Sequence, residues 1–385
     1  MRDWSQIMRP MPAVSRRPTV AIVGCRGIPN RYGGFEQFAE ELSVRLVRNG
    51  YAVFVYNVGH HPYADATLMG VKIVRKWCPE GLLGSAAHYI YDFLCLRDAV
   101  SRNVDIVLEL GYGTSSISMR LCDRGRTKIV TNMDGLEWRR EKFGRLTKML
   151  IKWSERQGTL QSDEVVADNI GIKEYLDETY GQDCHFIPYG ASVFSNPDAG
   201  ALYSLGLEPQ AYYLLIARLE PENKITMVLD GFLEAESRRR FIVVGGTDGK
   251  YGRWLKQKYA RNNIKFLGGI YDRATLDNLR YFARTYFHGH SAGGTNPSLL
   301  EAMGAQCLIA AHMNEFNQSV LGPDALYFDS KGDVSKMIDR NYPVETVRQF
   351  QENNRLKILT QYSWESIVHQ YDRLFMKIMD ADQVD

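Results

Sequence analysis

The sequence lacks an excess of charge of either sign. Among its 385 residues, Lys and Arg total 47 and Asp and Glu total 45, which leaves a formal charge of +2. A charge this small provides no overall field for gripping the phosphate backbone of a nucleic acid. We therefore expect no nucleic-acid partner.

Cysteine is also sparse. The six cysteines stand far apart with no Cys-x-x-Cys pair, at positions 25, 78, 95, 122, 184 and 307. This spacing indicates neither a zinc knuckle nor a disulfide framework, and it favours a reducing compartment such as the cytoplasm.

Long apolar runs are missing as well. No stretch of about 18 consecutive apolar residues occurs, so no transmembrane helix is predicted. Residues 1–17 contain four arginines, and the apolar run that follows them, residues 19–23, is too short for a signal peptide. We interpret residues 1–17 as a flexible tail and expect a cytoplasmic protein, with any membrane contact peripheral and at the inner face of the plasma membrane.

Short apolar runs alternate instead with helical stretches. The chain exceeds the ~250 to 300 residues at which one hydrophobic core stops growing, so two domains are expected. In the first half the expected strands, separated by helices such as 35–49, are 19–23, 52–56, 71–74, 105–110, 128–131, 164–167 and 184–187. This alternation predicts a parallel sheet covered by helices on both faces.

A polar stretch at residues 195–206 interrupts the pattern, which then restarts. The expected strands of the second half are 212–217, 240–244, 264–267, 285–288 and 307–310, and its expected helices are 225–236, 253–259, 273–283 and 298–305. Residues 344–379 are expected to be helical. Two such α/β domains place their ligand crevices at the carboxyl ends of their strands, so a ligand could lie between them.

The turn after the first strand, residues 24–36, is rich in glycine and opens a helix. It suits close approach of an anionic or hydroxyl-rich ligand to backbone N–H groups. A dinucleotide site is disfavoured, because the spacing is not Gly-x-Gly-x-x-Gly and the second strand ends in Tyr56-Asn57 without an acidic residue. The alternative is that Gly33 and Gly34 only permit a tight turn.

Asp134 follows another expected strand, in the segment TNMDGLEW at residues 131–138. The fold would place this segment at the crevice, where its carboxylates could contact a ligand. An aspartate before a glycine is also common as a turn or cap residue. Both interpretations remain open.

Two cationic residues, Arg218 and Lys224, follow the first strand of the second half. A guanidinium and an ammonium at the crevice edge suit a diphosphate by charge and geometry. The alternative is a surface salt bridge.

The most informative segment is residues 288–303, HGHSAGGTNPSLLEAM. A strand ends there in a polar turn, and Thr295 or Asn296 can cap a helix whose first residue is Pro297, so free N–H groups would face an anion. Glu301, one turn into that helix, could bind ribose hydroxyls or act as a surface acid. His288 and His290 lack a further ligand at matching spacing, so no metal site is expected.

At these residues the sequence resembles the family 4 retaining glycosyltransferases of the GT-B type, and within them the bacterial rhamnosyltransferase-like branch. The resemblance covers nearly the whole chain and rests on GCRGIPNRYGGFEQF, TNMDGLEW, FIPYGA, ARLEPEN and HGHSAGGTNPSLLEAM. It implies an α/β protein with two Rossmann-like domains facing across a cleft. The acceptor domain would be residues 18–190, the nucleotide-sugar domain residues 191–345, and residues 346–385 would form helices that return to the first domain.

The resemblance also implies roles for individual residues. Arg218 would contact the diphosphate, residues 294–298 would cradle it, and Glu301 would hold the ribose. The sequence departs from the family at Gly293, where a glutamate is usual, at Asn223, where a lysine is usual, and at residues 133–135, which replace a histidine. We expect the catalytic residues to be Asp134, Arg218 and Glu301. The expected donor-binding residues are Gly33, Gly34, Arg218, Lys224, His290, Gly294, Thr295, Asn296, Pro297, Ser298 and Glu301, with no metal or cofactor.

Residues 138–156 resemble a basic amphipathic helix. Basic residues such as Lys148 alternate with apolar ones such as Leu150, a pattern that favours contact with an anionic membrane presenting a lipid-linked acceptor. The alternative is a helix packed on its own domain with a solvated charged face.

The expected function is transfer of a sugar, L-rhamnose from dTDP-rhamnose by the branch resembled, onto a lipid-linked or polysaccharide acceptor in bacterial cell-surface glycan synthesis. Two alternatives remain. A nucleotide-sugar epimerase could have the same fold but would need acid and base groups at the sugar. A non-catalytic nucleotide-sugar binding protein would bind the donor without turnover.

Overall fold

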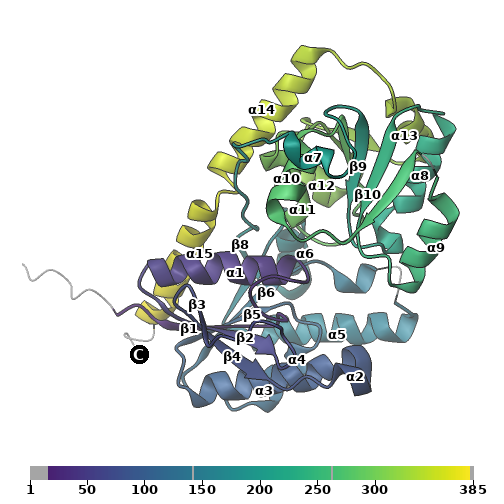
Figure 1. The fold of residues 1–385 in the computed structure, drawn as a ribbon. Helices are drawn as coiled ribbons and strands as arrows, with labels where there is room; N and C mark the ends of the chain where they lie inside the picture. The colour runs from purple at the N-terminus through teal and green to yellow at the C-terminus, as the bar shows by residue number, and fades with distance from the viewer. Residues whose placement is uncertain (1–15, 141–142, 262, 382–385) are drawn as a thin grey trace, which may run out of the picture.

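The structure is a computed structural model that describes residues 16–140, 143–261 and 263–381 (Figure 1). The tail expected at residues 1–17 therefore lies outside the described residues, apart from Arg16 and Arg17. The described chain forms two α/β units, each built on its own sheet.

The first unit contains an eight-stranded sheet of order β3-β4-β2-β1-β5-β6-β7-β8, parallel except for β3. Its strands are β1 (Thr19–Val23), β2 (Ala52–Val58), β3 (Thr67–Leu68), β4 (Val71–Lys76), β5 (Ile106–Leu110), β6 (Lys128–Met133), β7 (Glu164–Ala167) and β8 (His185–Phe186). The helices around it are α1 (Gly34–Arg48), α2 (Glu80–Leu83), α3 (Ala87–Ser101), α4 (Ser115–Leu121), α5 (Arg145–Gln161) and α6 (Ile170–Tyr180). The central strands are nearly continuous apolar runs because helices cover both faces.

The second unit contains a six-stranded parallel sheet of order β11-β10-β9-β12-β13-β14. Its strands are β9 (Tyr212–Ile216), β10 (Arg240–Val244), β11 (Ile264–Gly268), β12 (Thr285–His288), β13 (Ile309–His312) and β14 (Leu326–Phe328). Its helices are α7 (Gly200–Tyr203), α8 (Ile225–Glu234), α9 (Lys250–Tyr259), α10 (Arg273–Tyr281), α11 (Pro297–Gly304), α12 (Glu315–Leu321) and α13 (Lys331–Met337).

The expected α/β architecture of two parallel-sheet units is confirmed, with two local corrections in the second unit. The strand expected at 307–310 runs from Ile309 to His312, because Gln306 takes a left-handed φ of 54° after α11 and the following residues complete the turn. Strand β14 was not expected from the sequence, since its three residues are too few to show a pattern.

The C-terminal region consists of two helices, α14 (Val344–Thr360) and α15 (Trp364–Ala381), with a break at residues 361–363. Helix α14 contacts α11 of the second unit, and α15 contacts α1 of the first (Figure 1). Trp364 packs against Gly190, where a Cβ would lie 2.5 Å from the indole ring. Tyr371 accepts a hydrogen bond from Asn132 at 3.2 Å, so the chain end is fixed to the first sheet.

The helix expected at residues 138–156 is wrong in its extent. A 3₁₀ turn, η2 (Glu137–Arg139), is followed by a break, and α5 begins only at Arg145. Gly144 is the N-cap of α5 and has an extended backbone, which ends any continuous helix there. Residues 141 and 142 lie outside the described residues.

Candidate functional site

A cleft of about 780 Å³ lies between the two units. On the first unit it is bordered by the turns that follow β1, β5 and β6, and on the second by those that follow β9 and β12. The expected site residues that line it are Gly33, Gly34, Asp134, Arg218, His290, Gly294, Thr295, Asn296, Pro297, Ser298 and Glu301. The carboxyl ends of both parallel sheets thus converge on one space, as the topology requires.

Lys224 does not line the cleft, although it was expected to bind the donor. It takes a left-handed φ of 47° and serves as the N-cap of α8, while its neighbour Asn223 faces the cleft. The Asn223 amide donates a hydrogen bond to the Arg218 carbonyl at 2.7 Å. Asn223 therefore shapes the loop that presents the Arg218 guanidinium to the cleft.

The N-terminus of α11 has the expected cap, and Asn296 provides it. The Asn296 side chain accepts a hydrogen bond from the Ser298 N–H at 2.9 Å, and Pro297 occupies the first helical position. The expectation of free N–H groups is wrong at two positions. The Ser298 N–H is used by the cap, and the Thr295 N–H is donated to Asp168 of the first unit at 3.0 Å.

Both carboxylate oxygens of Glu301 are already engaged. One accepts a hydrogen bond from the Gln37 amide of the first unit at 2.7 Å, and the other is paired with the guanidinium of Arg280. Arg280 is 1% exposed and also lies 3.2 Å from Asp277. Sequence reasoning missed Gln37 and Arg280 as partners of Glu301, because both reach Glu301 only through tertiary packing.

Asp134, which is half-buried, and Asp168, which is fully buried, form a carboxyl pair where the two units meet. Their carboxyl groups are close enough to influence each other's protonation. Burial and the nearby Glu137 raise the pKa of Asp134 to about 6, and burial together with Asp134 raises the pKa of Asp168 well above its usual range. The pair therefore keeps a shared proton at moderately acidic pH.

Asp168 was not expected from the sequence. It directly follows β7, so it stands at the same sheet edge as Asp134, which follows β6. This position directly after a strand could have identified Asp168 from the sequence as a candidate site residue. Its backbone carbonyl also accepts a hydrogen bond from the Thr295 hydroxyl at 2.5 Å, so Asp168 holds Thr295 through two contacts.

Glycines allow the two units to approach closely. A Cβ on Gly135, which has a φ of +77°, would lie 2.8 Å from the Cα of Gly293, and a Cβ on Gly34 would lie 3.3 Å from Pro297. The turns of the first unit thus meet the loop before α11 backbone to backbone. Any side chain at Gly135 would force the cleft apart.

His288 and His290 stack with ring centroids 4.4 Å apart, and His290 alone lines the cleft. Burial, together with the charges of Arg218 and Arg140, lowers the pKa of His290 to about 3. His290 is therefore neutral at physiological pH and presents a neutral imidazole to the cleft.

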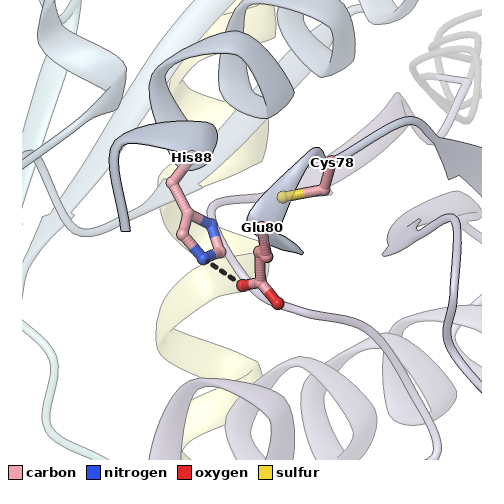
Figure 2. Close-up of side chains that lie close together, drawn as sticks. All are labelled: Cys78, Glu80 and His88. Carbon is pink, nitrogen blue, oxygen red and sulfur yellow. Dashed lines mark hydrogen bonds and ion pairs between the residues drawn. The ribbon is translucent and has the colours of Figure 1, made fainter. Parts of the chain in front are cut away.

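Among the described residues, one group of three potential metal ligands lies within 4.8 Å of one another: Cys78, Glu80 and His88 (Figure 2). Glu80 accepts a hydrogen bond from His88 at 2.7 Å and pairs with the Arg26 guanidinium at 2.8 Å. Burial raises the pKa of the Cys78 thiol to about 11, which keeps it protonated. Because Arg26 already supplies the positive charge, we assign this cluster as an ion-pair network at the rim of the cleft.

Comparisons with known proteins place this geometry in context. A family model described as a domain of unknown function (DUF1972) matches residues 17–192. A search of curated proteins found no match. Among solved structures, sucrose-phosphate synthase from Thermosynechococcus elongatus is similar, with a TM-score of 0.79 and 16% identity over 95% of this chain and 100% of that one.

Two further structures show the same arrangement. Anabaena Alr3699/HepE in complex with UDP-glucose has a TM-score of 0.71 and 13% identity over 94% of this chain and 99% of that one. The α,α-trehalose 6-phosphate synthase from Burkholderia multivorans has a TM-score of 0.71 and 11% identity over 96% and 98% of the two chains. This chain has the GT-B fold. In the part of the GT-B chain that the structure describes, no helix is long and apolar enough to span a membrane.

Proposed function

We propose that this protein is a retaining glycosyltransferase that uses a nucleotide diphosphate sugar. One observation carries the proposal: the guanidinium-bearing loop of Arg218 and the N-terminus of α11 line one side of the cleft, opposite the glycine turns of the first unit. A guanidinium and the positive end of the α11 helix dipole suit a diphosphate, and the facing turns leave room for a sugar and its acceptor. The likeness in fold to HepE, whose structure contains UDP-glucose, supports a nucleotide-sugar ligand.

In the proposed reaction, the donor diphosphate lies between Arg218 and the loop of residues 294–298. As the bond from the sugar to the diphosphate breaks, negative charge grows on the leaving group, and Arg218 stabilises it. The leaving phosphate takes the proton of the acceptor hydroxyl while the acceptor oxygen bonds to the anomeric carbon from the same face, so the anomeric configuration is retained. Asp134 and His290 border the place of the sugar and can accept its hydroxyl hydrogen bonds. The reaction as proposed uses no metal and no resident cofactor.

The proposed donor is dTDP-rhamnose, supported by the resemblance of the sequence to rhamnosyltransferase-like enzymes. The proposed acceptor is a lipid-linked or polysaccharide glycan of the bacterial cell surface, reached from the cytoplasmic side of the membrane.

The surface of α5 supports this membrane location. Its solvent-exposed apolar side chains include Leu146, which is 78% exposed, and Leu150, which is 62% exposed. They recur at helical spacing and comprise Leu146, Met149, Leu150, Trp153 and Leu160. A stripe of basic residues runs beside them and comprises Arg145, Lys148, Lys152 and Arg156.

The one acidic residue of α5, Glu155, points inward. It is fully buried and accepts hydrogen bonds from Tyr175 and Tyr180 at 2.8 Å and from Trp138 at 3.1 Å. The exposed face of α5 therefore carries apolar and cationic side chains and no acidic one, which matches an anionic bilayer. Figure 1 shows α5 at the periphery of the first unit, where a membrane can contact the exposed face of this helix.

The test is a donor-turnover assay. The protein is incubated with dTDP-rhamnose, with and without a lipid-diphosphate-linked sugar, and both dTDP release and the anomeric configuration of the product are measured. Acceptor-dependent dTDP release with retained configuration supports the proposal. Conversion of the donor sugar without an acceptor would indicate an epimerase, and donor binding without release under any acceptor would indicate a binding protein.

A further inference from the structure

A second pair of carboxyl groups lies on the first-unit side of the cleft, away from the α11 loop. Glu109 is the fourth residue of β5 and is 1% exposed, and Asp92, on α3, is 4% exposed. Both line the cleft. Neither belongs to the donor site described above.

The position of Glu109 in the strand order of the first sheet favours a ligand site there. Strands β1 and β5 are neighbours in the sheet, and Val23 pairs with Glu109. The chain proceeds from β1 toward β2 on one side and from β5 toward β6 on the other. The crevice outside the carboxyl ends of β1 and β5 is thus the switch point of the first sheet, where open α/β sheets bind their ligands.

The two carboxyl groups influence each other's protonation. Burial raises the pKa of Asp92 to about 7, and burial together with the charge of Asp92 raises the pKa of Glu109 well above its usual range. The pair therefore holds a proton near neutral pH.

One carboxyl oxygen of the pair lacks a hydrogen-bond partner among the described residues. The Thr114 hydroxyl donates to Asp92, but Oε1 of Glu109 has no hydrogen-bond partner within the described chain. This oxygen is buried against Gly24, where a Cβ would lie 2.6 Å from it. Burying a polar oxygen without a partner costs stability, so its retention in a residue that lines the cleft points to a ligand.

The hydrogen-bonding capacity of the two carboxyl groups indicates which kind of ligand fits. A carboxylate and a carboxylic acid that border the same cleft can accept a hydrogen bond from one hydroxyl of a ligand and donate one to another. Aromatic side chains border the same space, since Phe35 packs within 3.3 Å of the Cβ position at Gly111 and Tyr32 also lines the cleft. Vicinal hydroxyls together with an apolar C–H face are features of a pyranose ring.

We propose that Asp92 and Glu109 form the binding site for the acceptor sugar, a neutral pyranose with adjacent hydroxyl groups. The assignment of this sugar as the acceptor rests on the proposed function, whereas binding of the sugar does not. Arg26 and His88, which both pair with Glu80, border this site at its rim. Figure 2 shows His88 beside Glu80.

The experiment measures saturation-transfer NMR signals from the methyl glycosides of glucose, galactose, mannose, N-acetylglucosamine and rhamnose, with and without UDP. Variants Glu109→Gln and Asp92→Asn are compared with Glu178→Gln, which makes the same chemical change at an exposed position on α6. At least one glycoside should bind the unmodified protein and the Glu178→Gln variant. Its affinity should fall about ten-fold in Glu109→Gln and Asp92→Asn, because a hydrogen bond to a charged group is lost.

Three results would overturn the proposal: no glycoside binds, the carboxyl variants bind as well as the unmodified protein, or UDP displaces the glycoside. Thermal melting checks that both carboxyl variants are folded, and either one alone suffices for the comparison. If UDP and nucleotide sugars do not bind while a glycoside does, the proposed transferase activity fails and the sugar site stands.

Discussion

The carboxylate of Asp168 accepts a hydrogen bond from the backbone N–H of Thr295 at 3.0 Å, although the two residues belong to different units. The contact joins the end of β7 to the loop that precedes α11. It places a carboxyl group of the first unit on the loop expected to hold the donor diphosphate. The approach of the two units and the conformation of the loop before α11 therefore both depend on Asp168.

The first prediction concerns the pH dependence of this link. In the unfolded chain a carboxyl has a pKa of about 3.9, whereas Asp134 and Asp168 have raised pKa values in the folded protein. The folded state then binds more protons, so stability falls as pH rises from about 4 through about 6 and above. Asp168→Asn cannot ionise, and its melting temperature should fall less between pH 5 and pH 8.

The charged and titratable groups that face this pair are Glu137, Arg140, Tyr189, Arg218 and Tyr371. Burial raises the pKa of both tyrosines, so they stay neutral over this pH range. An equal fall in melting temperature for Asp168→Asn and the unmodified protein would show that the Asp134–Asp168 pair does not titrate as described.

The second prediction concerns Arg218. It is exposed and lines the cleft, so Arg218→Ala should leave the melting temperature nearly unchanged. If Arg218 stabilises the leaving diphosphate, kcat with saturating donor should fall about 100- to 1,000-fold. Arg218→Lys should recover part of the loss. Unchanged turnover in Arg218→Ala would remove this residue from the mechanism.

The third prediction concerns the buried pair of Arg280 and Glu301. Arg280→Met leaves the Glu301 carboxylate without its cation, and loss of one partner of a buried pair costs about 3 to 5 kcal/mol of unfolding free energy. The double variant Arg280→Met, Glu301→Leu should regain much of that stability while still binding the donor poorly. Urea denaturation and nucleotide titration measure the two effects. Full donor binding by the double variant would exclude Glu301 from the ribose site.

The fourth prediction concerns α5. Leu150→Glu should reduce co-sedimentation with anionic liposomes at low salt, because it places a charge in the exposed apolar face. The matched control is Leu356→Glu on α14, which changes a leucine that is 52% exposed in the helix that contacts the second unit. Equal binding by both variants, or no binding by the unmodified protein, would contradict docking through α5.

Much of the fold could be predicted because parallel strands covered on both faces leave apolar runs in the sequence. Strands β7, β10 and β12 have the expected bounds. The amphipathic pattern of residues 138–156 did not show where the helix begins. Gly144 interrupts the helix, but a single glycine leaves the alternation of basic and apolar residues unchanged.

The site was predictable where chain order alone decides position. Arg218, Asp134 and the loop before Pro297 all follow strands, and parallel strands bring their carboxyl ends to one edge. Asp168, Gln37 and Arg280 could not be assigned their partners in this way. Their contacts with Thr295 and Glu301 depend on how the two units meet and on packing between α10 and α11.

The most direct test of the central claim is a thermal-shift panel of UDP, dTDP, GDP and ADP sugars on the unmodified protein. A ligand present at 100 times its dissociation constant stabilises the folded state by about 2.7 kcal/mol, which a melting curve resolves. We predict a selective rise in melting temperature with dTDP-rhamnose, and a selective rise with another nucleotide sugar would change the donor while keeping the site. No rise with any nucleotide sugar would contradict the assignment of a donor site to Arg218 and the loop before α11.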